Sequence, residues 1–268
     1  MGSLENKGIE LTLNARVIDT DNFGWNFGFN FTHNVNEITG LLRTTDPNYE
    51  GVAVGFISGG VGNTVQIHTV GHPANSFYLF EQVYSQDGLP IEGLYVDRTG
   101  EGGNVSSNGR NKYHHHGPNA DYLMGVNSSF RYRNFDFSFS GRFSVGNYVY
   151  NNRASGTTYS ALYINTGYFN NISPYIRNTE FINPQYWSDT YVEDASFFKM
   201  DNISLGYSVD RLVGERLKAR FSFTVQNAFT ITEYTGIDPE VNDGFNPGID
   251  NNIYPRSRNF IVGINLTY

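Results

Sequence analysis

The sequence predicts an all-β fold in which antiparallel strands form the wall of a transmembrane β-barrel, and three observations support this prediction. Apolar and polar residues alternate with a period of two wherever a pattern exists. Charged residues make up only 16% of the 268 residues and aromatic residues another 16%, against about 25% charged residues in an average globular chain. Short and long connections between the predicted strands alternate strictly along the chain.

The first two predicted strands have chemically opposite faces. In 7–18 every second residue is apolar, from Ile9 to Val17, and polar residues stand between them. In 22–34 the alternating residues are aromatic, beginning with Phe23, and they face a row of Asn, Gly and Thr. Such alternation is typical of a strand with one apolar and one polar environment.

Later segments repeat this scheme and bring the predicted number of strands to about nine. The clear ones are 134–146, 202–209, 220–226 and 258–268, whereas the weaker ones are 63–70, 76–86 and 121–132. Because single-chain bacterial barrels have an even number of strands, nine strands imply further strands on the N-terminal side. A barrel strand that crosses the bilayer needs roughly 9–11 residues, which most of these segments supply.

The connections predict the orientation of the barrel. Outer-membrane barrels have tight periplasmic turns and long extracellular loops, and structureless loops this long are uncommon in other compact domains. The short connections are 19–21, 71–75, 133–134 and 210–215, and the long ones are 35–62, 87–120, 147–196 and 229–257. Aromatic residues near strand ends suggest a girdle at the membrane interface: Trp25, Tyr132, Tyr148, Tyr150, Tyr207 and Tyr268.

Composition and motifs exclude several classes of function. The chain has no cysteine, which removes thiolate catalysis and Cys-ligated metal sites, and its net charge of -8 offers no basic surface to nucleic acid. No apolar run approaches the ~18 residues that a membrane-spanning helix needs. Because metalloprotease, nucleophile-elbow and phosphate-loop motifs are all absent, we predict no enzyme and no catalytic residue.

Ten short motifs spread over the whole chain resemble the SusC/RagA-type TonB-dependent transporters. Each motif alone is weak, but together they are specific. They are ENKGIEL (5–11), WNFGFN (25–30), GNT (62–64), GHP (71–73), SFY (76–78), PIEGLYVD (90–97), GNYVYN (146–151), ASFFKM (195–200), QNAF (226–229) and YPR (254–256).

This resemblance implies that residues 1–268 are the C-terminal part of a large barrel of about 22 strands, without its plug domain and N-terminal strands. It implies an importer of glycans or peptides in the outer membrane of a Gram-negative bacterium, facing outer-membrane lipid. The expected partners are the N-terminal remainder of the barrel, a SusD-like lipoprotein lid, and TonB acting through the absent plug segment. A secreted, soluble β-sandwich that binds or cleaves glycans is the alternative, since strand patterns alone fit both.

Three sets of residues are candidate sites. The last strand resembles the signal read by the barrel-assembly machinery, with the residues Phe260, Val262, Gly263, Ile264, Leu266 and Tyr268. Aromatic side chains on a long loop are suited to stacking on substrate, namely Tyr159, Tyr163, Tyr168, Tyr175, Tyr186 and Trp187. The family often carries a calcium loop at the position of Asp97, Thr99 and Glu101, but Asn108 replaces the glutamate of loop position 12, so no firm metal site and no cofactor are predicted.

Two further polar clusters have ordinary explanations. Three consecutive histidines, 114–116, point in different directions, so we predict a polar loop rather than a metal site. Paired carboxylates can hydrolyse glycosides, but on the last long loop we predict a solvated surface for the acids Glu233, Asp238, Glu240, Asp243 and Asp250.

Overall fold

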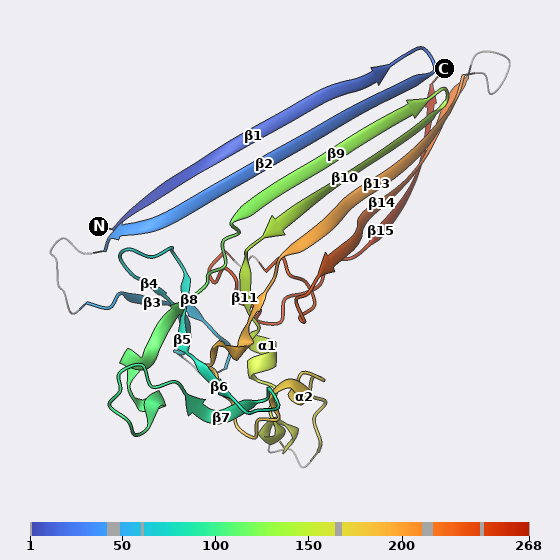
Figure 1. Cartoon of the computed structure of the whole chain (residues 1–268). Coiled ribbons are helices and arrows are strands. Elements are labelled where there is room, and N and C mark those ends of the chain that lie inside the picture. The colour runs from blue at the N-terminus through green and yellow to red at the C-terminus, as the bar shows by residue number, and fades with distance from the viewer. Residues whose placement is uncertain are drawn as a thin grey trace.

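The chain folds into a long antiparallel sheet with a module of loops and smaller sheets at one end of it (Figure 1). The computed structural model describes residues 2–41, 49–59, 62–163, 168–210, 217–241 and 244–267. Within these residues, no helix is long and apolar enough to cross a membrane.

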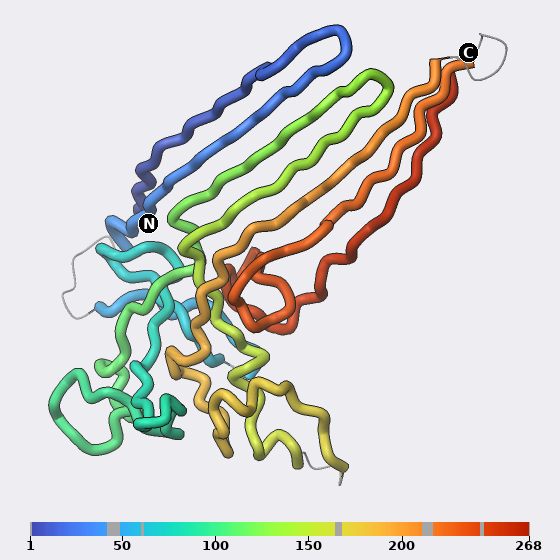
Figure 2. The backbone as a smooth tube through the Cα atoms, turned by 45° about the vertical axis from the view of Figure 1, so that its right-hand side comes forward, coloured from blue at the N-terminus to red at the C-terminus, as the bar shows by residue number. Residues whose placement is uncertain are grey.

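The long sheet has seven strands, each paired antiparallel with its neighbours. In sheet order the strands are β1 (Ser3–Asp19), β2 (Phe23–Gly40), β9 (Tyr122–Tyr132), β10 (Phe135–Val145), β13 (Phe197–Val209), β14 (Lys218–Thr232) and β15 (Asn259–Thr267). Figure 2 shows that short turns connect β1 to β2 and β9 to β10 at one end, whereas the chain enters the loop module at the other.

The predicted number of nine strands in this sheet is wrong, because segments 63–70 and 76–86 lie in the loop module. They form β4 (Thr64–His68), β5 (Ser76–Phe80) and β6 (Gln82–Tyr84). The centre of β4 and nearly all of β5 are buried, so these short strands have core on both faces. Connection 71–75 is therefore a turn within the module. Since both segments and the turn between them leave the long sheet together, the connections between the remaining strands still alternate between short and long.

One face of the long sheet is apolar and exposed. Val262 is 76% exposed, Ile264 63% and Leu11 61%, although each lies within a regular strand. The other sheets that the structure describes belong to the loop module, and none covers this face (Figure 1). The soluble sandwich would bury this face against a second sheet, and the described part of the chain provides none.

The opposite face of the sheet is polar, and its side chains bond from strand to strand. The Asn202 amide donates to the Ser140 hydroxyl at 2.6 Å, and the hydroxyls of Ser204 and Thr224 lie 2.8 Å apart. These pairs join β10, β13 and β14 through side chains in addition to the backbone ladder.

Near the short-turn end of this polar face, an ion pair crosses a glycine, and we call this arrangement the glycine window. Arg220 of β14 forms an ion pair with Asp136 of β10, and Gly206 of β13 lies between them. A Cβ atom at Gly206 would stand 2.3 Å from the Asp136 Oδ2 and 2.6 Å from an Arg220 nitrogen. The ion pair therefore requires glycine on the strand that it crosses.

The loop module has its own hydrophobic core. The largest fully buried side chains include Tyr150, Tyr191, Phe77, Phe181 and Leu79. The burial of Tyr150 shows that its assignment to an interfacial girdle is wrong, because β11 belongs to the module. Besides β4 to β6, its strands are β3 (Val52–Phe56), β7 (Pro90–Tyr95), β8 (Lys112–His115), β11 (Tyr148–Tyr150) and β12 (Val192–Asp194). Its helical segments are η1 (Val105–Ser107), η2 (Gly109–Asn111), α1 (Asn152–Ser155), η3 (Tyr159–Tyr163), α2 (Ile176–Thr179) and η4 (Asp189–Tyr191).

Candidate functional site

An ionic cluster forms where the last long loop crosses the polar face of the sheet. The Arg142 Nε donates to Asp201 at 3.1 Å, and its two Nη atoms donate to the Glu240 carboxylate at 2.6 and 2.9 Å. Asp201 occupies a β-bulge of β13, which turns its side chain to the polar face beside Arg142. Glu240 comes from the loop between β14 and β15, so the cluster joins this loop to the sheet.

Further charged groups complete the cluster. Glu240 also accepts from the Lys199 Nζ at 3.0 Å, and it forms an ion pair with Arg256. The Lys199 side chain is only 4% exposed, so it depends on this carboxylate for a partner. Asp238 accepts the Glu240 N–H at 3.0 Å and acts electrostatically on Lys199.

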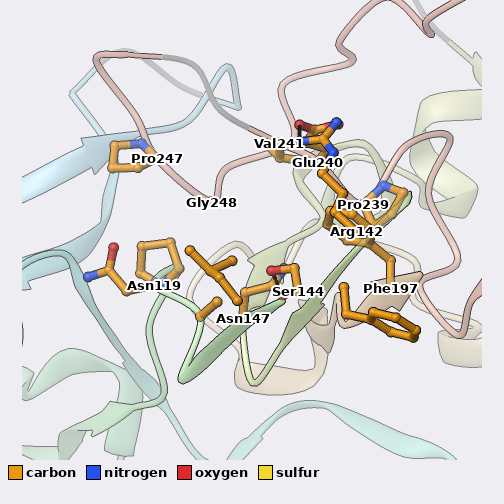
Figure 3. A pocket seen from close by; sticks show the side chains of 14 residues that line it. Asn119, Arg142, Ser144, Asn147, Phe197, Pro239, Glu240, Val241, Pro247 and Gly248 are labelled. Atoms are coloured by element: carbon orange, nitrogen blue, oxygen red, sulfur yellow. Dashed lines mark hydrogen bonds and ion pairs between the residues drawn. The ribbon is translucent and has the colours of Figure 1, made fainter. Parts of the chain in front are cut away.

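Two pockets lie on either side of Arg142. One, of about 270 Å³, lies between the ends of β10 and β13 and the last loop, and its lining includes Glu240 and Asn119 (Figure 3). The other, of about 420 Å³, extends along β9 and β10 and is lined partly by Asn30 and Asn127. The two pockets share Leu123, Arg142 and Phe143, so they form one cleft that we call the Arg142 cleft.

Glycines shape the floor of the Arg142 cleft. Asn30 of β2 lies opposite Gly125 of β9, and Asn127 lies opposite Gly28. A Cβ atom at Gly125 would stand 2.7 Å from the Asn30 amide, and one at Gly28 would stand 2.5 Å from the Asn127 amide. Each amide therefore folds over the glycine of the neighbouring strand and faces the polar side of the sheet.

The predicted loop aromatics divide into two groups. Tyr159 is 42% exposed, Tyr163 70% and Tyr168 80%, so these three are accessible to a ligand. The hydrophobic core of the module is packed against by the other three, Tyr175, Tyr186 and Trp187. The Trp187 Nε1 also donates to the Thr64 carbonyl at 3.2 Å, which is a structural contact. Stacking on substrate therefore stays a prediction for the first three.

The predicted calcium loop is closed by its own hydrogen bonds. The Asp97 carboxylate accepts the backbone N–H groups of Thr99 at 3.1 Å, Gly100 at 2.8 Å and Gly102 at 2.7 Å. These donors, led by that of Gly102, lower the pKa of Asp97. Glu101 binds Arg110 at 2.8 Å instead of turning towards Asp97. Calcium binding by Asp97, Thr99 and Glu101 thus stays a prediction, which a metal titration tests.

The three consecutive histidines contact different neighbours, although the rings of His115 and His116 also meet edge to face. His114 stacks on His72 with ring centroids 3.6 Å apart, whereas His116 stacks on Tyr148 at 3.7 Å. Burial, together with the neighbouring His72, lowers the pKa of His114 to about 4. In the part of the chain that the structure describes, no group of three or more His, Asp or Glu side chains could hold a metal ion.

The last strand, β15, presents alternate apolar side chains on one face. Phe260, Val262, Ile264 and Leu266 are each at least 58% exposed, whereas Gly263 lies on the opposite face against Ser222. Tyr268 lies outside the described residues. This arrangement agrees with the pattern expected of a barrel-assembly signal, whose recognition stays a prediction.

The acids of the last loop are only partly a solvated surface. Glu233 is exposed, and Asp243 lies outside the described residues. Asp250 is 3% exposed and accepts from the Tyr234 hydroxyl at 2.8 Å, and Glu240 is central to the ionic cluster. Arg142 and Lys199 are cations on strands of mostly uncharged residues, which indicates that each needs a counter-charge but does not show that Glu240 supplies it.

Comparison with known proteins identifies the relatives of this chain. It is 42% identical over 280 residues to the TonB-dependent receptor SusC of Bacteroides thetaiotaomicron, covering 100% of this chain and 27% of that receptor. The chain is homologous to a segment of the SusC/RagA-type TonB-dependent receptors. This segment is also 30% identical over 304 residues to the TonB-dependent receptor P3 of Formosa agariphila, covering 100% of the chain and 29% of that receptor. No protein-family model matches it.

Solved structures of the RagAB peptide transporter share the fold of this chain. One structure matches 98% of this chain with a TM-score of 0.70 and 21% sequence identity. The open-open state of the RagAB peptide importer matches 100% of this chain with a TM-score of 0.71 and 20% sequence identity. Each match covers 29% of the other chain. The segment thus spans less than a third of the receptors that it matches. The homology is to outer-membrane receptors of Gram-negative bacteria and not to enzymes.

Proposed function

We propose that this chain forms the C-terminal wall and three extracellular loops of an outer-membrane importer for glycans or peptides. The importer draws energy from TonB through a plug segment outside this chain, and a SusD-like lipoprotein closes over its extracellular loops. Homology to SusC and the RagAB fold support this proposal.

The observation that carries the proposal is the opposition of the two faces of the sheet. Side chains such as Val262 and Ile264 are more than 60% exposed on one face, whereas hydroxyls and amides bond to each other on the other. A barrel wall between hydrocarbon and a polar lumen has this distribution. The apolar face then lies against lipid, and the Arg142 cleft lines the lumen.

The sheet must continue beyond its two outer strands. Among the described strands, β1 pairs only with β2, and β15 only with β14. Unpaired backbone groups in hydrocarbon cost several kcal/mol each, so open edges are incompatible with a lipid environment. The remainder of the receptor therefore pairs with both strands, and residues 1–268 supply seven strands of the closed barrel.

Orientation follows from the connections. In the closed barrel the short turns face the periplasm, and the loop module, built from the three long connections, faces outwards. The accessible side chains Tyr159, Tyr163 and Tyr168 then lie on the extracellular side, where they can stack on substrate before it enters the lumen.

A chimaeric receptor tests the function. Residues 1–268 replace the matching segment of the Bacteroides SusC, and uptake of fluorescent neutral oligosaccharides and of fluorescent peptides is measured in cells with and without TonB. We expect TonB-dependent uptake of one of the two classes. A folded chimaera that imports neither class contradicts the proposal.

Labelling on whole cells tests the orientation separately. Single cysteines at Asn119 and Ser160 should react with an impermeant thiol reagent, because both positions are exposed in the loop module. A cysteine at Asp210, in the turn after β13, should stay unlabelled. Equal labelling of all three positions contradicts the orientation.

A further inference from the structure

The charged groups in and beside the Arg142 cleft balance one another in sign. Three cations, Arg142, Lys199 and Arg256, meet three carboxylates. Asp201 and Glu240 form the ion pairs, and Asp238 lies close enough to act electrostatically on Lys199. The cluster therefore has no net charge, and it provides no excess field that attracts an ionic ligand.

Arg142 is held by the protein on all three nitrogens. Its Nε is shared between both oxygens of Asp201 at 3.1 Å, and its Nη atoms form a two-point contact with Glu240. Each Nη keeps a second hydrogen, but a ligand carboxylate that binds through the fork geometry must displace either the Nε from Asp201 or the Nη pair from Glu240. A peptide terminus or acidic side chain therefore finds no unpaired counter-charge here.

Neutral hydrogen-bonding groups, by contrast, are free in the cleft. The side-chain amides of Asn30, Asn119 and Asn127 are exposed and make no hydrogen bond with another described residue. Each amide carries two donors and one acceptor, which suits neighbouring hydroxyl groups. Leu123, which is 49% exposed, and Pro239 add apolar surface beside these amides.

We propose that the Arg142 cleft is a lumenal subsite for a neutral glycan chain, an inference that rests on the importer function proposed above. Sugar hydroxyls bond to Asn30, Asn119 and Asn127, and the C–H faces of the sugar rings lie on Leu123 and Pro239. The Arg142–Glu240 contact positions the last loop so that both parts of the cleft stay joined. Peptides are the competing class, and the test includes them.

Binding to the purified full-length chimaera in nanodiscs tests the subsite. Isothermal titration uses neutral oligosaccharides of four to eight sugar units, and peptides of the same length. We expect Asn30→Ala and Asn127→Ala each to weaken glycan binding about tenfold, since each removes hydrogen bonds to the ligand. Asn26→Ala is the matched control, because Asn26 lies on the same face of β2 but outside both pockets. The affinity of this variant for glycans should change less than twofold.

A second variant tests the charge balance. Asp201→Asn frees the Arg142 Nε and leaves the cleft with a net positive charge. It should gain at least threefold in affinity for oligosaccharides that contain a uronic acid, relative to neutral ones. Heat-modifiable migration of every variant verifies that the barrel is folded.

The outcomes separate the subsite from the importer function. If glycans bind and are imported but both asparagine variants match the control, the subsite is wrong and the importer stands. If peptides bind and glycans do not, the glycan assignment is overturned and the importer again stands. If neither class binds, the subsite is overturned, and the uptake experiment decides on the importer.

Discussion

The long sheet and the loop module are stabilised in opposite ways. The sheet exposes large apolar side chains such as Ile9, at 61%, and Val262, at 76%, although its backbone is regular. The module buries Tyr150 and Tyr191 completely and is built mostly of irregular backbone. A regular backbone and a hydrophobic core are therefore separable in this chain. The sheet depends on its surroundings to cover its apolar face, whereas the module carries its own core.

Opening a cavity in the module should have the largest effect. Phe77→Ala removes a fully buried ring and should cost about 3–5 kcal/mol of module stability. Limited proteolysis on intact cells measures it as faster cleavage of the loops, while heat-modifiable migration of the barrel persists. Tyr254→Ala is the control, because its side chain is 93% exposed. Loss of the barrel together with the module would show that the two regions do not fold separately.

A charge on the apolar face tests whether the long sheet depends on its surroundings to cover this face. Phe223→Arg should cost roughly 2–4 kcal/mol, because an arginine there faces lipid in the proposed barrel. Ser222→Arg, on the polar face of the same strand, should cost far less. The fraction of heat-modifiable receptor in the outer membrane measures both. Equal losses would mean that both faces of the sheet are covered by protein.

The ionic cluster connects the two regions, and breaking it should have an intermediate effect. Glu240→Gln leaves Lys199, whose side chain is 4% exposed, without its carboxylate. Because Arg142 is partly solvated, we expect a cost of about 1–3 kcal/mol, below the full value for a buried pair. Thermal unfolding of the purified receptor measures it, with the exposed Glu233→Gln as control. No difference between the two variants would contradict the role of the cluster.

The module should also lose stability in acid, through His114. Burial and His72 lower the pKa of His114 to about 4, against about 6.5 in an unfolded chain. The unfolded state therefore binds the proton first, so stability is full above pH 6.5 and falls as the pH decreases towards 4. Loop proteolysis measured between pH 7.5 and 4.5 should accelerate, and His114→Gln should flatten the profile. An unchanged profile in the variant excludes His114 as the cause.

Calcium should have the smallest effect. Because the Asp97 carboxylate already accepts three backbone N–H groups, 1 mM calcium should shift the melting temperature of the receptor by less than about 1 °C. A shift of several degrees that Asp97→Asn abolishes would establish the calcium site.

The sequence predicted the long sheet well, because its alternation repeats over whole strands from Ile9 to Leu266. It failed for 63–70 and 76–86, since a short strand buried on both faces has a hydrophobic pattern that resembles a membrane strand. The Arg142 cleft could not be predicted either. Arg142 and Glu240 are 98 residues apart in the sequence, and only the folded chain brings them together.

Gly206 limits how the wall can slide. A shift of β13 by two residues against its neighbours keeps every apolar side chain on the lipid side, so the alternation of faces alone does not exclude it. Such a shift would place Ser204 or Ser208 between Asp136 and Arg220, where a side chain would push this ion pair apart. The glycine window therefore favours one stagger of the strands, and the stagger of the strands sets the diameter of a barrel. A residue without a side chain in this way contributes to the width of the barrel that we propose.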